Sequence, residues 1–274
     1  VESTETREQY FLNGIGKYIS EQERYMKIPS ATIAYWVSEN FIKAFGHKNV
    51  ADFGFAGIGM RTGDNNRFLR LWYEVANSNT LFGCTSVEEQ IESMKKWIPY
   101  NKGGEFRRWY GNNDYVVNWY NNGYEIKENT RRVYPQLGDD LGWKISNEQY
   151  YFKKGITWSG VTISKCSFRV YEEGYIFDSG ANGYFLYDDN NRYYLAACLN
   201  NAITLYVMEI INPTVNNGSG TIRKIPIIID KRLKPDIDKL AKENIYISKH
   251  DWDSFETSWD FQHHPLIRKV PTIA

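Results

Sequence analysis

The residues best suited to chemistry lie between Gly57 and Phe68, where glycines are mixed with arginine, threonine and asparagine. Glycine adopts the positive φ angles of tight turns, which lets a backbone approach a phosphate closely. Arginine and asparagine are the side chains that read base edges through paired hydrogen bonds. Because this segment runs straight into the apolar-rich stretch 68–75, the spacing predicts a polar loop that feeds a strand.

A second basic segment, 102–112, interleaves lysine and arginine with glycine and aromatic residues. Lys102, Arg107 and Arg108 suit contact with phosphates, and Trp109 suits stacking or wedging beside a groove. The alternative is an exposed hairpin whose Trp109 packs in the core, because basic clusters are common on protein surfaces. Both interpretations stay open at this point.

Methyltransferase motifs are incomplete in this sequence. Residues 55–59 fit the Phe-x-Gly-x-Gly pattern of loops that hold S-adenosylmethionine, but such a loop should close a strand and open a helix. Here another turn, 61–66, follows directly, so we expect no cofactor site. The Pro-Pro pair of the loop that grips the adenine amine is also missing, and Asn212-Pro213-Thr214 is better explained as a turn that ends a helix. We expect no catalytic activity from this chain alone.

Other functional sites receive little support. Residues 250–253 and 260–264 contain histidine and aspartate, but three metal ligands on rigid elements are not indicated, so we expect no metal site. Cys84, Cys166 and Cys198 are scattered, which is typical of reduced thiols in a cytoplasmic protein. No apolar run approaches the roughly 18 residues that span a bilayer, so we expect no membrane helix.

The elements that must position these residues are of both kinds. We expect helices within 4–24, 33–46, 87–97, 193–211 and 235–242. We expect strands at 68–75, 156–164, 166–171 and 225–229, and short strands with long loops across 100–150. The predicted fold class is therefore mixed α/β (α+β), with a mixed or antiparallel sheet and flanking helices.

The charge distribution leaves a basic face possible on a neutral protein. The 274 residues include 33 basic and 33 acidic side chains, and this balance argues mildly against nucleic-acid binding. The charges are segregated, however, with five basic residues against one acid in 95–108 and seven acids against three lysines in 236–260. Aromatic residues make up 16% of the chain, which indicates a folded protein.

Eight blocks of sequence, in order along the chain, resemble PglX-type adenine methyltransferases of BREX phage-defence systems. They are IAYWVS at 33–38, GMRTGDNNRF and its continuation at 59–75, WIPYNKGG at 97–104, RRWYGN at 107–112, VVNW at 116–119, GITWS at 155–159, FDSG at 177–180 and DWDSFE at 251–256. The resemblance implies a target-recognition-domain-like segment that lies after a catalytic domain. It implies a helical lead-in at 1–50, a target-recognition core at 51–190 and a closing helix-strand-helix segment at 191–274.

The same resemblance implies a division of labour. An upstream domain would use S-adenosylmethionine to methylate a flipped adenine, and this segment would bind double-stranded DNA and select the sequence. Further partners would be that upstream domain, other BREX subunits or a phage inhibitor, with no role for a membrane. The residues expected at the DNA are Arg61, Thr62, Asn65, Asn66, Arg67, Arg70, Lys102, Arg107, Arg108 and Trp109.

Two other function classes stay open from the residues alone. Abundant tyrosine and tryptophan among asparagine, aspartate and glycine also suits a carbohydrate-binding module, and the aromatic loops of 100–150 suit a protein-interaction domain. Neither would have a DNA role. DNA binding collapses as salt concentration rises, whereas sugar binding ignores it, so salt dependence separates these classes.

Overall fold

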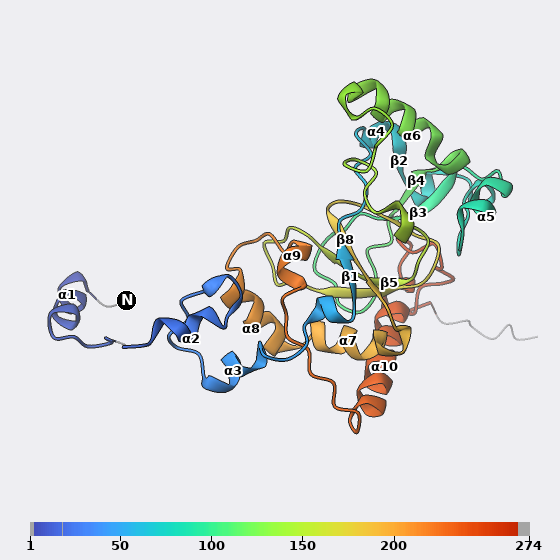
Figure 1. Ribbon diagram of the computed structural model, residues 1–274. Helices are drawn as coiled ribbons and strands as arrows, with labels where there is room; N and C mark the ends of the chain where they lie inside the picture. The colour runs from blue at the N-terminus through green and yellow to red at the C-terminus, as the bar shows by residue number, and fades with distance from the viewer. Residues whose placement is uncertain (1–2, 18, 268–274) are drawn as a thin grey trace, which may run out of the picture.

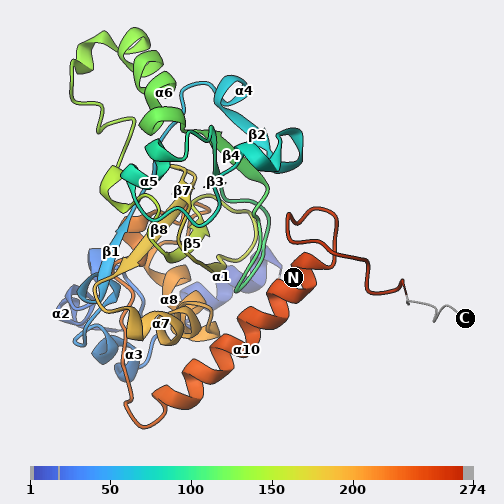
Figure 2. The same ribbon diagram turned by 90° about the vertical axis from the view of Figure 1, so that its right-hand side faces the viewer.

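The computed structural model describes residues 3–17 and 19–267, and Figures 1 and 2 show their arrangement in two views. The helices are α1 (Thr4–Leu12), α2 (Gln22–Met26), α3 (Glu39–Ala44), α4 (Asn65–Phe68), α5 (Val87–Glu92), α6 (Tyr120–Val133), α7 (Arg192–Leu199), α8 (Ala202–Ile211), α9 (Ser219–Ile222) and α10 (Lys234–Asp253). The strands are β1 (Gly54–Gly57), β2 (Leu69–Leu71), β3 (Trp97–Asn101), β4 (Tyr115–Asn118), β5 (Gly155–Ser159), β6 (Phe168–Tyr171), β7 (Ile176–Phe177) and β8 (Ala181–Leu186).

The strands form two sheets of four. The first has the order β1-β8-β5-β6 and is antiparallel throughout, with Gly54 of β1 opposite Leu186 of β8. The second has the order β2-β4-β3-β7, in which β7 pairs with β3 in parallel and the other pairs are antiparallel. The predicted mixed α/β class with a mixed or antiparallel sheet is therefore confirmed.

The first sheet is buried on both faces, because the side chains of each strand point alternately to two different cores. Tyr184 joins the core that β5 and β6 form with α7 and α8, whereas its neighbour Phe185 joins the core of the second sheet. Figure 2 shows the resulting order, with α4 and α6 above, the two sheets in the middle, and α7 and α8 below. The strands GITWS and FRVY are accordingly buried along almost their whole length, although apolar side chains alternate with polar or small ones in them. The buried Thr157 and Arg169 donate to backbone carbonyls.

Polar side chains begin several of these helices. Ser38, Ser86 and Asn201 accept hydrogen bonds from backbone N–H groups in the first turns of α3, α5 and α8. Pro235 lies in the first turn of α10, where its missing N–H is not needed. Helix α1 buries no side chain and stands away from the sheets in Figure 1.

The expected helices have different limits in the structure. Helix α1 and the start of α2 replace the one expected at 4–24, and only α3 lies within 33–46. The helix predicted at 87–97 ends at Glu92, and Met94 then adopts a positive φ of 55°. The helix predicted at 193–211 is two helices, α7 and α8, which meet at 74°. No single helix of the described residues is long and apolar enough to cross a membrane, although these two satisfy length and composition together. Helix α10 is longer than the predicted 235–242.

Two other local predictions were wrong. Residues 225–229 form no strand, and the segment makes one isolated bridge, between Pro226 and Asn49. Proline has no N–H to donate to a ladder, which disfavours a strand there. Residues 100–150 contain the helix α6, in which Asn121, Asn122 and Gly123 form a left-handed turn before the regular helix begins. The Asn122-Gly123 pair therefore predicted a turn correctly, but we did not predict the helix that continues from this turn.

Candidate nucleic-acid interface

The glycine-rich loop after β1 is anchored to the last residue of β7 and to the residue that follows it. The Gly59 N–H donates to the Asp178 carbonyl at 3.2 Å, and the Met60 N–H donates to the Phe177 carbonyl at 2.9 Å. A Cβ at Gly59 would lie 1.8 Å from the Phe177 carbonyl oxygen. Glycine is therefore required here for close packing of two backbones, and the loop leaves the core at a fixed point.

Beyond this anchor, the loop turns into the short helix α4. The buried Thr62 hydroxyl donates to the Asn65 side-chain oxygen, and the Asp64 carboxylate accepts from the Arg67 N–H at 3.1 Å. These two contacts fix the start of α4. Asn65 and the neighbouring Asn66 are exposed, so their amide groups can reach an external partner.

Two arginines from different elements meet at one amide oxygen. Arg67 of α4 and Arg132 of α6 both donate to the Asn129 side-chain oxygen, at 3.4 and 2.9 Å. Glu125 lies 3.8 Å from Arg67 and offsets part of the positive charge. Both arginines are exposed, so their remaining N–H donors face solvent.

An exposed tryptophan lies beside Arg61, because the Arg61 N–H donates to the Lys144 carbonyl at 2.8 Å and joins the two loops. Trp143 is 57% exposed. The Arg61 guanidinium lies 5.9 Å from the Trp143 ring centroid, and the Lys144 ammonium lies 4.6 Å from the same ring and 4.0 Å from that of Tyr134. Cations at such distances attract an aromatic face.

We call the group formed by Arg61, Arg67, Arg132, Trp143 and Lys144 the α6 surface. It lies around α4 and α6, at the top of Figure 2. Its cations suit phosphate oxygens, and its tryptophan presents an apolar ring of the kind that stacks on bases or wedges between them. Four segments of the chain contribute to this surface, so it depends on the fold rather than on one basic stretch.

Arg70 is committed to local contacts. Its guanidinium donates to the carbonyls of Asn66 and Leu69 at 2.7 and 2.6 Å, and it lies 6.0 Å from the Trp97 ring centroid. Carbonyls at the end of a helix lack partners within the helix, so Arg70 satisfies the end of α4. The contact with its carbonyl fixes the backbone of Asn66.

The second basic segment lies beside α10 and β6, and each of its cations has an intramolecular partner. Lys102 lies 3.6 Å from the Asp178 carboxylate. Arg107 pairs with Asp251 at 3.2 Å and lies 4.8 Å from the Trp252 ring centroid, so it joins this segment to the end of α10. Arg108 lies over the Phe106 ring, at 5.5 Å from its centroid.

Trp109 is half-buried against the core of the first sheet. Its N–H donates to the Phe168 carbonyl at 2.8 Å, and its carbonyl accepts from Val170 at 2.8 Å. Behind it, the buried Arg169 donates to the Arg107 carbonyl at 3.3 Å, and burial lowers the pKa of Arg169 to about 10. Of the two interpretations of Trp109 that the sequence left open, the one in which its side chain packs against the core describes its position.

The structure divides the sequence-predicted residues into two groups. Arg61, Thr62, Asn65, Asn66, Arg67 and Arg70 lie in or beside α4, whereas Lys102, Arg107, Arg108 and Trp109 lie in the segment that contacts β5, β6 and α10. Sequence reasoning missed Arg132, Trp143 and Lys144. The adjacent Trp143-Lys144 pair and the Arg131-Arg132 pair were visible signals, but nothing in the sequence alone placed the first beside Arg61 or the second near Arg67.

Within the described ranges, 3–17 and 19–267, no group of three or more histidine, cysteine, aspartate or glutamate side chains could hold a metal ion. The three cysteines are free, and burial raises the pKa of Cys84 to about 11 and that of Cys166 to about 12. These thiols are therefore protonated at neutral pH, which makes them poor nucleophiles.

No protein-family model matches the chain. Two curated proteins do resemble it along most of its length. The adenine-specific methyltransferase PglX of Lacticaseibacillus casei (strain Zhang) is 32% identical over 277 residues, covering 98% of this chain and 22% of that protein. The adenine-specific methyltransferase BrxX of Escherichia coli O9:H4 (strain HS) is 34% identical over 257 residues, covering 92% of this chain and 19% of that protein. The chain spans about a fifth of the length of these relatives, and as such a segment it belongs to the PglX and BrxX family of adenine-specific methyltransferases.

Proposed function

We propose that this chain is the DNA sequence-recognition segment of an adenine-specific DNA methyltransferase that acts in phage defence of the BREX type. The observation that carries the proposal is the α6 surface, where Arg61 and Lys144 lie against the exposed Trp143 while Arg67 and Arg132 share one amide oxygen of α6. The names of both relatives, which are adenine-specific methyltransferases, support the same function.

In this proposal the α6 surface and the adjacent helix α4 contact the duplex. Arg61, Arg67, Arg132 and Lys144 bind phosphates, which positions the protein without reading sequence. Asn65 and Asn66 are exposed amides that suit adenine in the major groove, where a bidentate contact is worth about 1–3 kcal/mol of discrimination. Thr62 and Arg70 position these two amides.

Lys102, Arg107 and Arg108 remain proposed phosphate ligands, with Trp109 behind them. Their present partners, Asp178, Asp251 and the Phe106 ring, would compete with phosphate. Their contribution to DNA affinity is therefore smaller than that of the α6 surface.

The chemistry itself belongs to a part of the protein outside this chain. There, S-adenosylmethionine would supply the methyl group to an adenine flipped from the duplex, at a cost of a few kcal/mol for unstacking. The proposed partners are double-stranded DNA, that catalytic domain, and other BREX subunits or a phage inhibitor. The proposed compartment is the cytoplasm.

The test is fluorescence anisotropy with labelled duplex DNA between about 50 and 200 mM salt. The double variant Arg61→Gln, Arg132→Gln removes two cations from the α6 surface. It should lower the slope of log K against log salt by about 0.9 per lost contact. The matched control, Arg232→Gln with Lys239→Gln, removes two highly exposed cations near α10 and should leave the slope unchanged.

Equal slopes for both double variants would contradict the α6 surface as the DNA contact. Binding that ignores salt in the wild-type chain would contradict DNA recognition itself and favour the carbohydrate alternative. Salt-independent capture of another protein would favour the interaction-domain alternative.

A further inference from the structure

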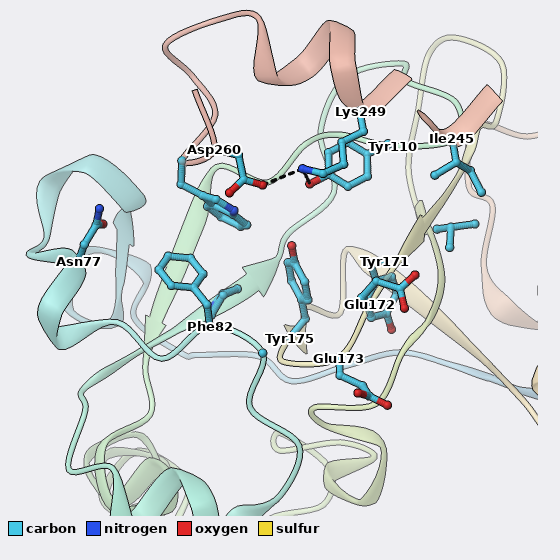
Figure 3. Close-up of a pocket in the computed structure, with 14 residues that line it drawn as sticks. Asn77, Phe82, Tyr110, Tyr171, Glu172, Glu173, Tyr175, Ile245, Lys249 and Asp260 are labelled. Atoms are coloured by element: carbon cyan, nitrogen blue, oxygen red, sulfur yellow. Dashed lines mark hydrogen bonds and ion pairs between the residues drawn. The ribbon is translucent and has the colours of Figure 1, made fainter. Parts of the chain in front are cut away.

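A cavity of about 510 Å³ opens between α10, the loop 77–83 and the turn that joins β6 to β7. Figure 3 shows Phe82 and Tyr175 facing this cavity, with Asp260 and Lys249 meeting across its edge. We call it the α10 pocket. It is defined by Phe82, Tyr110, Glu173, Tyr175, Trp259 and Asp260.

Aromatic rings from separate segments form a continuous wall in the α10 pocket. The Trp259 ring centroid lies 5.2 Å from that of Phe82 and 6.2 Å from that of Tyr175, and Tyr171 extends the row at 5.5 Å from Tyr175. Burial raises the pKa of both Tyr110 and Tyr175, so these rings are neutral at physiological pH. Neutral aromatic faces carry partial negative charge and attract cations.

The pocket already holds one cation of the chain itself. The Lys249 ammonium lies 5.0 Å from the Tyr110 ring centroid and 2.7 Å from the carboxylates of both Asp253 and Asp260. Burial alone would lower the pKa of Lys249, but the hydrogen bonds to these carboxylates raise it above its ordinary value. Aromatic rings and carboxylates therefore stabilise a positive charge here.

The lining of the pocket carries more negative than positive charge. Glu172, Glu173 and Asp260 contribute three carboxylates, and Lys249 contributes one ammonium. Glu172 is partly neutralised by Arg192 at 3.0 Å, whereas the Glu173 side chain is exposed. Such a pocket repels the phosphates of DNA and favours a positively charged group.

We propose that the α10 pocket receives an arginine side chain from a basic segment of another protein. A guanidinium group is planar, so it can stack on the ring of Trp259 or Tyr175 while its edge donates to a carboxylate. The pocket is also large enough for the apolar stem of such a side chain. This site is separate from the α6 surface, so it does not depend on the proposed DNA contact.

The test uses three blocked tripeptides, acetyl-Gly-X-Gly-amide, in which X is arginine, lysine or citrulline. Citrulline has almost the shape of arginine but no charge. Binding is followed by NMR through the indole N–H signal of Trp259, which the variant Trp259→Phe identifies by its loss. The arginine peptide should bind at least about tenfold more tightly than the citrulline peptide, a difference of about 1.4 kcal/mol.

Two variants locate the binding. Glu173→Gln removes one carboxylate and Phe82→Ala removes one ring, and each should weaken the arginine peptide roughly two- to fivefold. The control Glu243→Gln removes an exposed carboxylate of α10 away from the pocket and should change nothing. Equal binding of arginine and citrulline, tighter binding of lysine, insensitivity to Glu173→Gln or a Trp259 shift caused by duplex DNA would each overturn the proposal.

Discussion

Replacing Gly59 with alanine tests the packing of the glycine-rich loop against β7. The new Cβ would lie 1.8 Å from the Phe177 carbonyl oxygen and 2.3 Å from its carbonyl carbon, and real Cβ atoms essentially never approach below 3.0 Å. The backbone of Phe177 cannot easily move away, because it also pairs with Asn101 of β3. The two backbones would therefore have to separate by more than an ångström.

The size of the effect follows from what this separation breaks. The hydrogen bonds from Gly59 to Asp178 and from Met60 to Phe177 would be lost, at about 1 kcal/mol each. Strain from overpacking adds about 1–3 kcal/mol. We expect Gly59→Ala to lower the free energy of unfolding by about 3–5 kcal/mol, a large share of the 5–15 kcal/mol that is typical of folded proteins.

Urea unfolding followed by circular dichroism measures this change. The control is Gly220→Ala, because a Cβ at Gly220 would meet nothing within 4 Å and alanine favours the helix α9. The control should keep or slightly raise the stability. The reasoning is refuted if Gly59→Ala keeps its unfolding free energy within about 1 kcal/mol of wild type at an unchanged m-value.

Three further predictions concern contacts away from this loop. In a double-mutant cycle, Arg107→Met and Asp251→Asn should couple by only about 0.2–1 kcal/mol, because Asp251 is 59% exposed; strict additivity would show that the pair contributes nothing. Asn200→Ala should lower the free energy of unfolding in urea by about 1–3 kcal/mol, because the Asn200 amide hydrogen-bonds both the N–H and the carbonyl of Phe168 in β6. An unchanged urea midpoint would contradict a stabilising role for these two hydrogen bonds. The melting temperature should fall as pH rises above about 10, because burial raises the pKa of Tyr100 and Tyr175 in the folded state while the unfolded tyrosines ionise near 10. A constant melting temperature from pH 8 to 11 would contradict this linkage between tyrosine ionisation and unfolding.

The sequence predicted the fold class because its strong local signals agreed with the final packing. We expected strands at 156–164 and 166–171, and the structure has β5 and β6 within or beside these ranges, as antiparallel neighbours. The order of strands in each sheet was beyond such reasoning. The partner of β1 is β8, and no local pattern connects strands so far apart in the chain.

The candidate site was predicted in part for the same reason. Arg61, Asn65 and Arg67 lie in one short segment, so their types and spacing could be seen together. Arg132 joins them because Asn129 of α6 contacts Arg67 of α4, and Trp143 joins them because the Arg61 N–H bonds to the Lys144 carbonyl. Side-chain chemistry was readable from sequence, whereas its convergence required the tertiary structure.

The pairing of β1 with β8 also has a consequence for synthesis of the protein on the ribosome. Gly54 emerges roughly 130 residues before its partner Leu186, so at about 5–20 residues per second the wait is about 7–26 s. During this time β1 exposes unpaired N–H and carbonyl groups, which other chains can join, and one edge of β5 does the same from its own synthesis until β8 follows. A nascent chain arrested before residue 181 should therefore be a preferred client of chaperones, and release beyond residue 186 should end that dependence.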